Sequence, residues 1–312
     1  MGKLAYVFPG QGSQAVGMLA DLAGEHSLIE ATFEEASAAL GYDLWQLAQS
    51  GPEDKLNQTE FTQPALLAAS IAIWRVAQSL GAVKPDVVAG HSLGEYSALV
   101  AAGVIGFADA IKLVQQRGQF MQTAVPLGQG GMAAVLGLED DIVRELCAKA
   151  SHGEELVQAA NYNAPGQVVI AGSNAALERA IEALKDAGAK RAMPLAVSAP
   201  FHSALMRPAA DKMAEALAGV TFNSPEIQVL QNVDAGYHSN VDEIRSNLVA
   251  QMFSAVLWTE TIQRLAADDV TTVVECGPGK VLSGLTKRID KSIQGLSINS
   301  LESLTTTLET LG

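Results

Sequence analysis

Hydrophobic positions along the chain form short continuous runs, and between these runs apolar residues recur at helical spacing. A short apolar run bounded by turn residues is typical of a buried strand. Strands that alternate with helices indicate a mainly parallel sheet covered on both faces, so we predict the α/β fold class. The strands are expected at 4–8, 86–89, 227–231, 271–275 and 292–298.

Long helical patterns fill the intervals between these strands. One helix is predicted over 63–80, with Pro64 near its first turn, where a missing N–H is tolerated. Two more are predicted over 107–124, with Arg117 near the middle, and over 202–218.

The order of the predicted strands and helices changes after a proline- and glycine-rich stretch at 126–131. The next segments follow the order β-α-β-β-α-β, which is the ferredoxin-like arrangement. We therefore predict a small α+β domain at 127–199, inserted into a large domain made of 1–126 and 200–312. Its strands are expected at 132–138, 156–160, 167–171 and 191–197, and its helices at 140–150 and 174–187.

The segment from Gly90 to Gly94 reads G-x-S-x-G, between a predicted strand and a segment of helical composition. Strand, tight turn and helix are the context in which this motif presents a nucleophilic serine. Ser92 would stand at the tip of the turn, at a helix N-terminus whose N–H groups can stabilise an oxyanion. The pattern indicates acyl transfer through a serine ester.

A serine hydroxyl needs a base, and the chain has five histidines. His26, His152 and His238 lie in polar segments and are expected to be solvated. His91 adjoins Ser92, but neighbours on a sharp turn point apart, so we expect it to support the turn. His202 lies in the loop at 198–203 that returns to the large domain, and it is either the base or a helix cap.

Composition narrows the class of protein. The chain has 312 residues, 48% of them hydrophobic, and its net charge of −14 argues against general nucleic-acid binding. We find neither an apolar run of 18 residues nor a secretory signal, so we expect no membrane association. The two cysteines fit a reducing cytoplasm, and no histidine or cysteine cluster has metal-ligand spacing.

Five motifs together resemble the malonyl-CoA:acyl-carrier-protein transacylase family, in order and over nearly the whole chain. They are the segments 8–14, 90–96, 116–118, 199–203 and 275–279. The resemblance implies an α/β-hydrolase-like large domain that carries a ferredoxin-like small one. It also implies transfer of malonyl from coenzyme A to the phosphopantetheine thiol of acyl carrier protein, for fatty acid biosynthesis, by a monomer without a bound cofactor.

The same resemblance implies roles for individual residues. Ser92 would be the nucleophile and His202 the base, and the backbone carbonyl of Gln251 would orient that histidine. Arg117 would bind the malonyl carboxylate, since its planar fork can hold a carboxylate through two hydrogen bonds. Two further groups follow: the oxyanion hole of Gln11 and Leu93, and the remaining substrate-binding positions His91, Phe201, Asn161 and Asn163.

Several alternatives stay open at this point. A serine thioesterase would share the turn but normally adds an acidic third member and gives the acyl group to water. A polyketide-pathway malonyl transferase would use the same chemistry, and a non-catalytic acyl-binding module would use none. Phe201 resembles the malonyl-selecting version of the family, because its ring should crowd an α-methyl group.

An acidic carrier protein would have to dock on a local basic patch of this acidic chain. Candidate cations for such a patch are Lys185, Lys190, Arg191, Lys280, Lys287 and Arg288.

Overall fold

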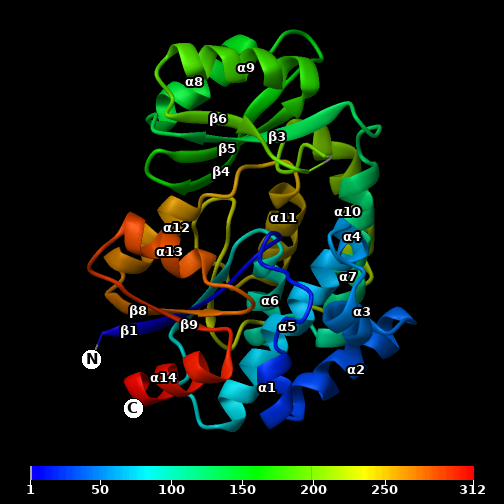
Figure 1. Ribbon diagram of the computed structural model, residues 1–312, viewed down its shortest axis with the longest axis vertical. Coiled ribbons are helices and arrows are strands. Elements are labelled where there is room, and N and C mark those ends of the chain that lie inside the picture. Colours follow the sequence, from blue (N-terminus) through cyan, green and yellow to red (C-terminus); the bar gives the residue numbers. More distant parts are fainter. Residues whose placement is uncertain (1, 198) are drawn as a thin grey trace.

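The computed structural model describes residues 2–197 and 199–312. Ser198, which belongs to the loop predicted before His202, lies outside the described residues. Two separate sheets organise the chain, one parallel and one antiparallel, and Figure 1 shows the antiparallel sheet above the rest of the molecule. The mixed α/β class expected from the hydrophobic pattern is confirmed.

The parallel sheet has five strands in the order β7-β2-β1-β8-β9. β1 lies at its centre and pairs with β2 so that Phe8 is level with Gly90. The turn after β1 therefore lies beside the turn that carries Ser92. The strands are β1 (Lys3–Phe8), β2 (Val87–Gly90), β7 (Gln228–Leu230), β8 (Val270–Cys276) and β9 (Gln294–Ile298).

Alternate residues of β1 belong to different hydrophobic cores, because successive side chains on a strand point to opposite faces. Leu4, Tyr6 and Phe8 pack into the larger core, and Ala5 and Val7 pack into the core on the other face. Both faces of the sheet are therefore covered, which explains why its strands read as continuous apolar runs.

Helices on both faces complete the large part of the molecule (Figure 1). The face toward Tyr6 is covered by α5, α6 and their neighbours, and the opposite face by α12 and α13. The helices are α1 (Ala20–Glu25), α2 (Leu28–Leu40), α3 (Leu44–Ser50), α4 (Glu53–Leu56), α5 (Thr59–Ser79), α6 (Gly94–Ala101), α7 (Phe107–Thr123), η1 (Ala204–Met206), α10 (Arg207–Ala218), α11 (Val241–Gln251), α12 (Trp258–Ala267), α13 (Val281–Ile289) and α14 (Leu301–Leu311).

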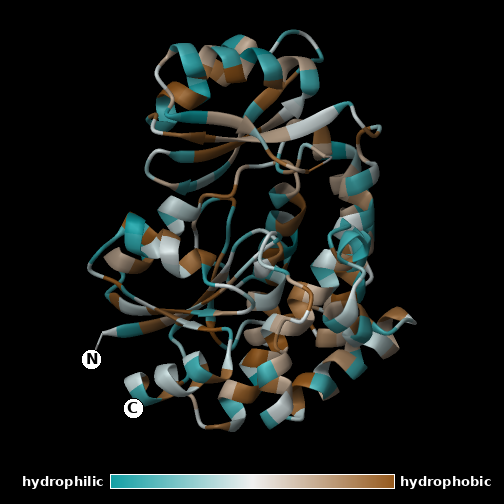
Figure 2. Cartoon of the chain, viewed as in Figure 1, coloured by the Kyte–Doolittle hydropathy of each residue, from teal (hydrophilic) through white to brown (hydrophobic). Residues whose placement is uncertain are grey.

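The antiparallel sheet has four strands in the order β4-β5-β3-β6. Its helices α8 and α9 bury their apolar residues in one core with the strands, and Figure 2 shows hydrophilic and hydrophobic residues alternating along both helices. The elements are β3 (Gly130–Leu136), α8 (Asp140–Ala150), β4 (Val157–Ala164), β5 (Gln167–Ser173), α9 (Asn174–Asp186) and β6 (Arg191–Pro194).

Two predicted helix starts were wrong. α5 begins at Thr59 and not at 63, so Pro64 lies inside the helix. A proline there removes the single backbone bond to Glu60, and the buried residues around it hold the helix together. α10 begins at Arg207, because His202 has a φ of 58°, which a right-handed helix cannot continue.

Candidate active site

The turn between β2 and α6 holds Ser92 in a left-handed backbone conformation, with a φ of 53°. The flanking glycines are required because the backbone segments approach closely. A Cβ on Gly90 would collide with the backbone of Gly94, and one on Gly94 would collide with the carbonyl of Phe8. The G-x-S-x-G spacing is therefore a packing requirement of the strand-turn-helix unit.

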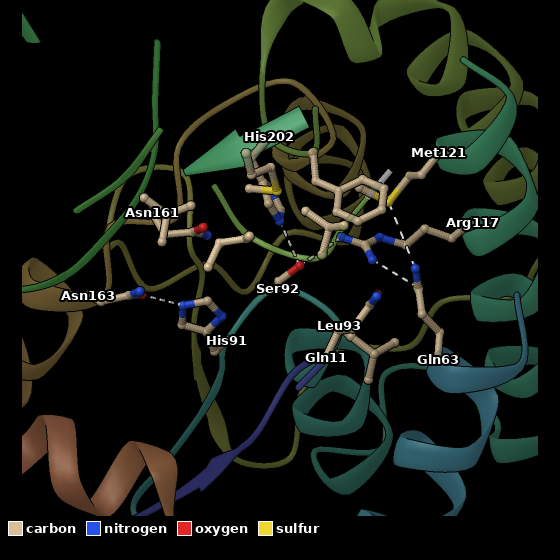
Figure 3. Close-up of a pocket in the computed structure, with 15 residues that line it drawn as sticks. Gln11, Gln63, His91, Ser92, Leu93, Arg117, Met121, Asn161, Asn163 and His202 are labelled. Atoms are coloured by element: carbon tan, nitrogen blue, oxygen red, sulfur yellow. Dashed lines mark hydrogen bonds between the residues drawn. The ribbon is translucent and has the colours of Figure 1, made fainter. Parts of the chain in front are cut away.

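Ser92 and His202, which lie 110 residues apart in the sequence, meet at this turn (Figure 3). The Ser92 Oγ is 2.7 Å from His202 Nε2. On the other side of the ring, Nδ1 is 2.8 Å from the backbone carbonyl of Gln251. A carbonyl only accepts, so Nδ1 carries the proton and the lone pair of Nε2 faces the serine hydroxyl.

The ring of His202 is buried, at 3% exposure. Burial and the nearby charge of Arg117 lower the pKa of His202 to about 3, against the raising effect of the bond to Gln251. The imidazole is therefore neutral at physiological pH, which is the form that can accept the serine proton.

Arg117 on α7 is fully enclosed, at 1% exposure, and reaches the same point. One guanidinium nitrogen donates to Gln63 Oε1 at 2.8 Å, and the other donates to Ser92 Oγ at 3.1 Å and Gln251 Oε1 at 2.8 Å. Burial lowers the pKa of Arg117. Within the described ranges, 2–197 and 199–312, no carboxylate forms an ion pair with it.

These side chains open onto a cavity of about 210 Å³. It lies between the turns of the parallel sheet and the antiparallel sheet, and its lining combines polar and apolar side chains. All the sequence-predicted site residues except Gln251 line it; the full lining is Gln11, Gln63, His91, Ser92, Leu93, Arg117, Met121, Met132, Asn161, Asn163, Val169, Leu195, Val197, Phe201 and His202.

His91 faces away from the serine hydroxyl, as expected for neighbours on a sharp turn (Figure 3). Its Nε2 is 2.8 Å from Asn163 Oδ1, and its ring packs against Trp258. Burial lowers the pKa of His91. The bond to Asn163 connects the Ser92 turn to β4 of the antiparallel sheet, so His91 supports the turn between the two sheets. Asn161 lines the cavity from the same strand.

Two backbone N–H groups near Ser92 are free to bind an oxyanion. In the part of the chain that the structure describes, the N–H groups of Gln11 and Leu93 donate to no other group. Leu93 follows the serine at the start of α6, and Gln11 lies in the turn after β1, which the strand register places alongside. A helix N-terminus adds its partial positive charge at this point.

Among residues 2–197 and 199–312, no carboxylate lies at hydrogen-bond distance from the His202 ring. Glu95 is a buried carboxylate bonded to the Gln251 side chain, and its oxygens also accept from Gln231 and the backbone of Asn232. The partner of His202 is the Gln251 carbonyl instead. Ser92 and His202 thus form a dyad oriented by the backbone.

The other histidines lie away from the cavity. His152 is exposed, and His26 and His238 are half-buried and keep part of their surface in contact with solvent. His238 packs between Asp234 and Glu243; burial acts to lower its pKa, but the hydrogen bonds to these two carboxylates and their charges outweigh it, so the pKa of His238 is raised.

Sequence reasoning missed two polar residues of the site, Gln63 and Asn232. Gln63 holds Arg117, and Asn232 Oδ1 accepts from the backbone N–H of Ser92 at 2.7 Å. Neither lies in a motif: Gln63 is one of many residues on a long helix, and Asn232 follows a short strand. The sequence offers no distinguishing signal for either residue.

Neither a metal site nor a membrane span is found among residues 2–197 and 199–312. No group of three His, Cys, Asp or Glu side chains in these ranges is arranged to hold a metal ion. No helix among the same residues has the length and hydropathy needed to span a bilayer.

Known proteins resemble this chain over nearly its whole length. The acyl transferase domain family matches residues 5–302. A malonyl CoA-acyl carrier protein transacylase of Escherichia coli strain K12 is 55% identical over 309 residues, which cover 99% of this chain and 100% of that protein.

Solved structures agree with this family. An acyl carrier protein S-malonyltransferase from Vibrio cholerae has a TM-score of 0.96 and 57% identity, covering 98% of this chain and 99% of that one. A malonyl-transacylase in complex with a type II PKS acyl-carrier protein has a TM-score of 0.97 and 53% identity, covering 99% of each chain. The chain therefore belongs to the acyl transferase family and, within it, to the malonyl CoA-acyl carrier protein transacylases.

Proposed function

We propose that the chain transfers malonyl from coenzyme A to the phosphopantetheine thiol of acyl carrier protein through a malonyl ester of Ser92, in fatty acid biosynthesis. The observation that carries this proposal is the buried guanidinium of Arg117, which lies 3.1 Å from Ser92 Oγ and forms no direct ion pair with a carboxylate among residues 2–197 and 199–312. A buried charge is costly unless it is paired, so the cavity favours an acyl group that brings its own carboxylate.

The first half-reaction acylates the serine. His202 Nε2 accepts the proton of Ser92 Oγ while the oxygen attacks the thioester carbonyl carbon. The N–H groups of Gln11 and Leu93 would stabilise the tetrahedral oxyanion, each contributing about 3 kcal/mol. The C–S bond then breaks, and the coenzyme A sulfur leaves with the proton that His202 returns.

The second half-reaction runs in the reverse sense. The carrier thiol gives its proton to His202 and attacks the carbonyl carbon of the malonyl ester. The C–O bond to Ser92 breaks, and His202 returns the proton to the serine oxygen. Because the two thiols use one site in turn, the kinetics should be ping-pong.

The remaining cavity residues would bind and select the acyl group. Phe201 is buried at the cavity wall, where its ring would crowd an α-methyl group and disfavour methylmalonyl. His91, Asn161 and Asn163 would contact the thioester arm where it passes between the sheets.

We propose that the pantetheine arm reaches the serine along a series of neighbouring cavities. A second cavity of about 170 Å³ shares Gln11, His91 and Asn163 with the active-site cavity and extends to Gln167. Gln167 Oε1 accepts from Arg288. Arg288 lines a third cavity of about 350 Å³, and that cavity is where we propose the acidic carrier protein docks.

We also propose the finer architecture and setting. The strand order β4-β5-β3-β6 with two helices supports a ferredoxin-like domain at 127–199, and the strand-turn-helix around Ser92 supports an α/β-hydrolase-like domain at 1–126 and 200–312. The two free buried cysteines support a cytoplasmic location. Exposed large hydrophobic residues are scattered over several elements, which supports a monomer.

Intact-mass measurement tests the function directly. The protein is incubated briefly with malonyl-CoA and then with phosphopantetheinylated carrier protein. We expect one malonyl adduct, absent in a Ser92→Ala variant, that passes to the carrier thiol. An adduct released as free malonate, with no gain on the carrier, would indicate a thioesterase. A carrier of a polyketide system, compared with one of fatty acid synthesis, distinguishes the two pathways by rate.

A further inference from the structure

One amide side chain bridges both sides of the Ser92 turn. Asn232 Oδ1 accepts from the backbone N–H of Ser92, and its Nδ2 donates to the carbonyl of Gly90, both at 2.7 Å. Asn232 is fully buried and follows β7, the strand next to β2. Ser92 has a positive φ, so neither a helix nor a strand partner satisfies its N–H; the Asn232 side chain does.

Asn232 is itself held by Glu95 in the first turn of α6. The backbone N–H of Asn232 donates to Glu95 Oε2 at 2.8 Å, and Gln231 Nε2 donates to Oε1 at 2.9 Å. Gln251 Nε2 donates to Oε2 at 3.1 Å. With three donors and 1% exposure, the carboxylate is a fixed junction between α6, the end of β7 and α11.

Gln251 connects this junction to the reacting groups. Its Nε2 donates to the Ser92 carbonyl at 3.1 Å, its Oε1 accepts from Arg117, and its backbone carbonyl accepts from His202. The serine backbone, the base and the guanidinium are therefore all attached to groups that Glu95 and Asn232 hold in place.

We propose that Asn232 and Glu95 are positioning residues of the transfer reaction: they hold Ser92 in its left-handed conformation and fix Gln251, so that Oγ meets His202 Nε2. Neither side chain lines the active-site cavity, so they act through Ser92 and Gln251 and not by direct contact with the substrate. The role in malonyl transfer rests on the proposed function, whereas the positioning of Ser92 rests only on the hydrogen bonds around it.

The test compares Asn232→Ala and Glu95→Gln with wild type. Asn299→Ala is the matched control: its Nδ2 also donates to a backbone carbonyl, that of Gly279, outside the site. We expect Asn232→Ala to lower kcat about 100-fold, the scale of a small misplacement of reacting atoms. KM for malonyl-CoA should change less than about threefold, because binding groups are intact. Glu95→Gln should lower kcat in the same way, to a smaller extent, and Asn299→Ala should retain wild-type kcat.

Two readouts separate positioning from folding and from substrate choice. Malonyl and acetyl transfer should fall by the same factor, since the nucleophile is common to both. A fluorophosphonate labels Ser92 without malonyl-CoA. In Asn232→Ala and Glu95→Gln, the rate of this labelling should fall together with kcat. If wild type were labelled but not acylated by malonyl-CoA, the proposed function would fail, while the labelling rates would still test the role of Asn232.

Folded variants, identified by circular dichroism and melting temperature, decide the outcome. Labelling at the wild-type rate in folded Asn232→Ala would overturn the proposal, as would a raised KM with unchanged kcat. If Asn232→Ala does not fold, Glu95→Gln, which keeps the volume of the side chain, tests the proposal by the same two measurements.

Discussion

The guanidinium of Arg117 is buried, hydrogen-bonded only to neutral groups, and adjacent to the serine hydroxyl. Replacing it by alanine should lower kcat/KM for malonyl-CoA about 100- to 1,000-fold, the cost of removing one partner of a buried charge pair. Acetyl-CoA has no carboxylate to lose a partner, so acetyl transfer should fall less. Malonyl and acetyl transfer are both measured on each enzyme preparation. The Gln63→Ala variant, which removes one hydrogen-bond partner of the guanidinium, is measured in the same way for comparison. Equal losses for the two substrates would remove Arg117 as the carboxylate clamp.

The other residue-scale prediction concerns the pH dependence of acylation. The base must be neutral, and the pKa of His202 is lowered to about 3, so its protonation should cost no activity between pH 7 and 5. Glu95 is another buried titratable group nearby; burial raises its pKa to about 7 against the effect of its donors and Arg117. We therefore expect the acylation rate to fall as the pH drops through about 7, where Glu95 takes up a proton, and we expect this fall to be absent in Glu95→Gln. If the acylation rate of this variant still fell as the pH dropped through about 6.5, the ordinary pKa of histidine, the low pKa of His202 would be contradicted.

At the scale of the element, the turn from β2 into α6 depends on the absence of a side chain at Gly94. Gly94→Ala should destabilise the fold by about 3 kcal/mol, because its Cβ would collide with the Phe8 carbonyl. Gly284 on α13 is the matched control: a Cβ there meets nothing within 4 Å, so Gly284→Ala should stabilise the helix by about 0.5–1 kcal/mol. Urea titration measures both free energies of unfolding. A Gly94→Ala variant as stable as wild type would contradict the packing argument.

The elements that sequence reasoning predicted well are those whose signal is local. β1 is a continuous apolar run because both its faces are buried, and α8 is a short helix with one apolar face, so period and composition suffice. The start of α5 was missed because the helix continues through Pro64, and this depends on packing around the proline that the sequence does not display.

The residues of the site also differ in whether a local sequence signal marks them. The Ser92 turn is a strand-turn-helix signal contained in a few residues, and the resemblance to the family indicated His202, Arg117 and Gln251. Asn232 could not be predicted, because its two bonds join it to a turn about 140 residues earlier and an asparagine after a strand has no distinguishing pattern. Residues that hold a site from a neighbouring strand are specified only by the sheet order.

At the scale of the whole molecule, the distribution of charge matters more than any single side chain. The chain carries a net charge of −14, yet Lys190, Arg191 and Arg288 surround one cavity at the junction of the two sheets. Arg191 is the first residue of β6 and Lys190 directly precedes it, whereas Arg288 belongs to the last turn of α13, so the folded structure gathers cations that are far apart in sequence. Lys185, Lys280 and Lys287, predicted with them, do not line this cavity. A local basic cleft on an acidic protein is suited to orient an acidic partner.

Reversing this charge should weaken carrier-protein docking without changing the chemistry at Ser92. We expect the double variant Lys190→Glu with Arg191→Glu to raise KM for the carrier protein about tenfold, while acylation by malonyl-CoA keeps its rate. The matched control is Lys84→Glu with Lys112→Glu, which makes the same charge change at two exposed lysines elsewhere. Because exposed charges are screened by salt, the difference between the two double variants should shrink as ionic strength rises. An equal rise of KM in both would mean that only net charge matters, and the cleft would then not be the docking site.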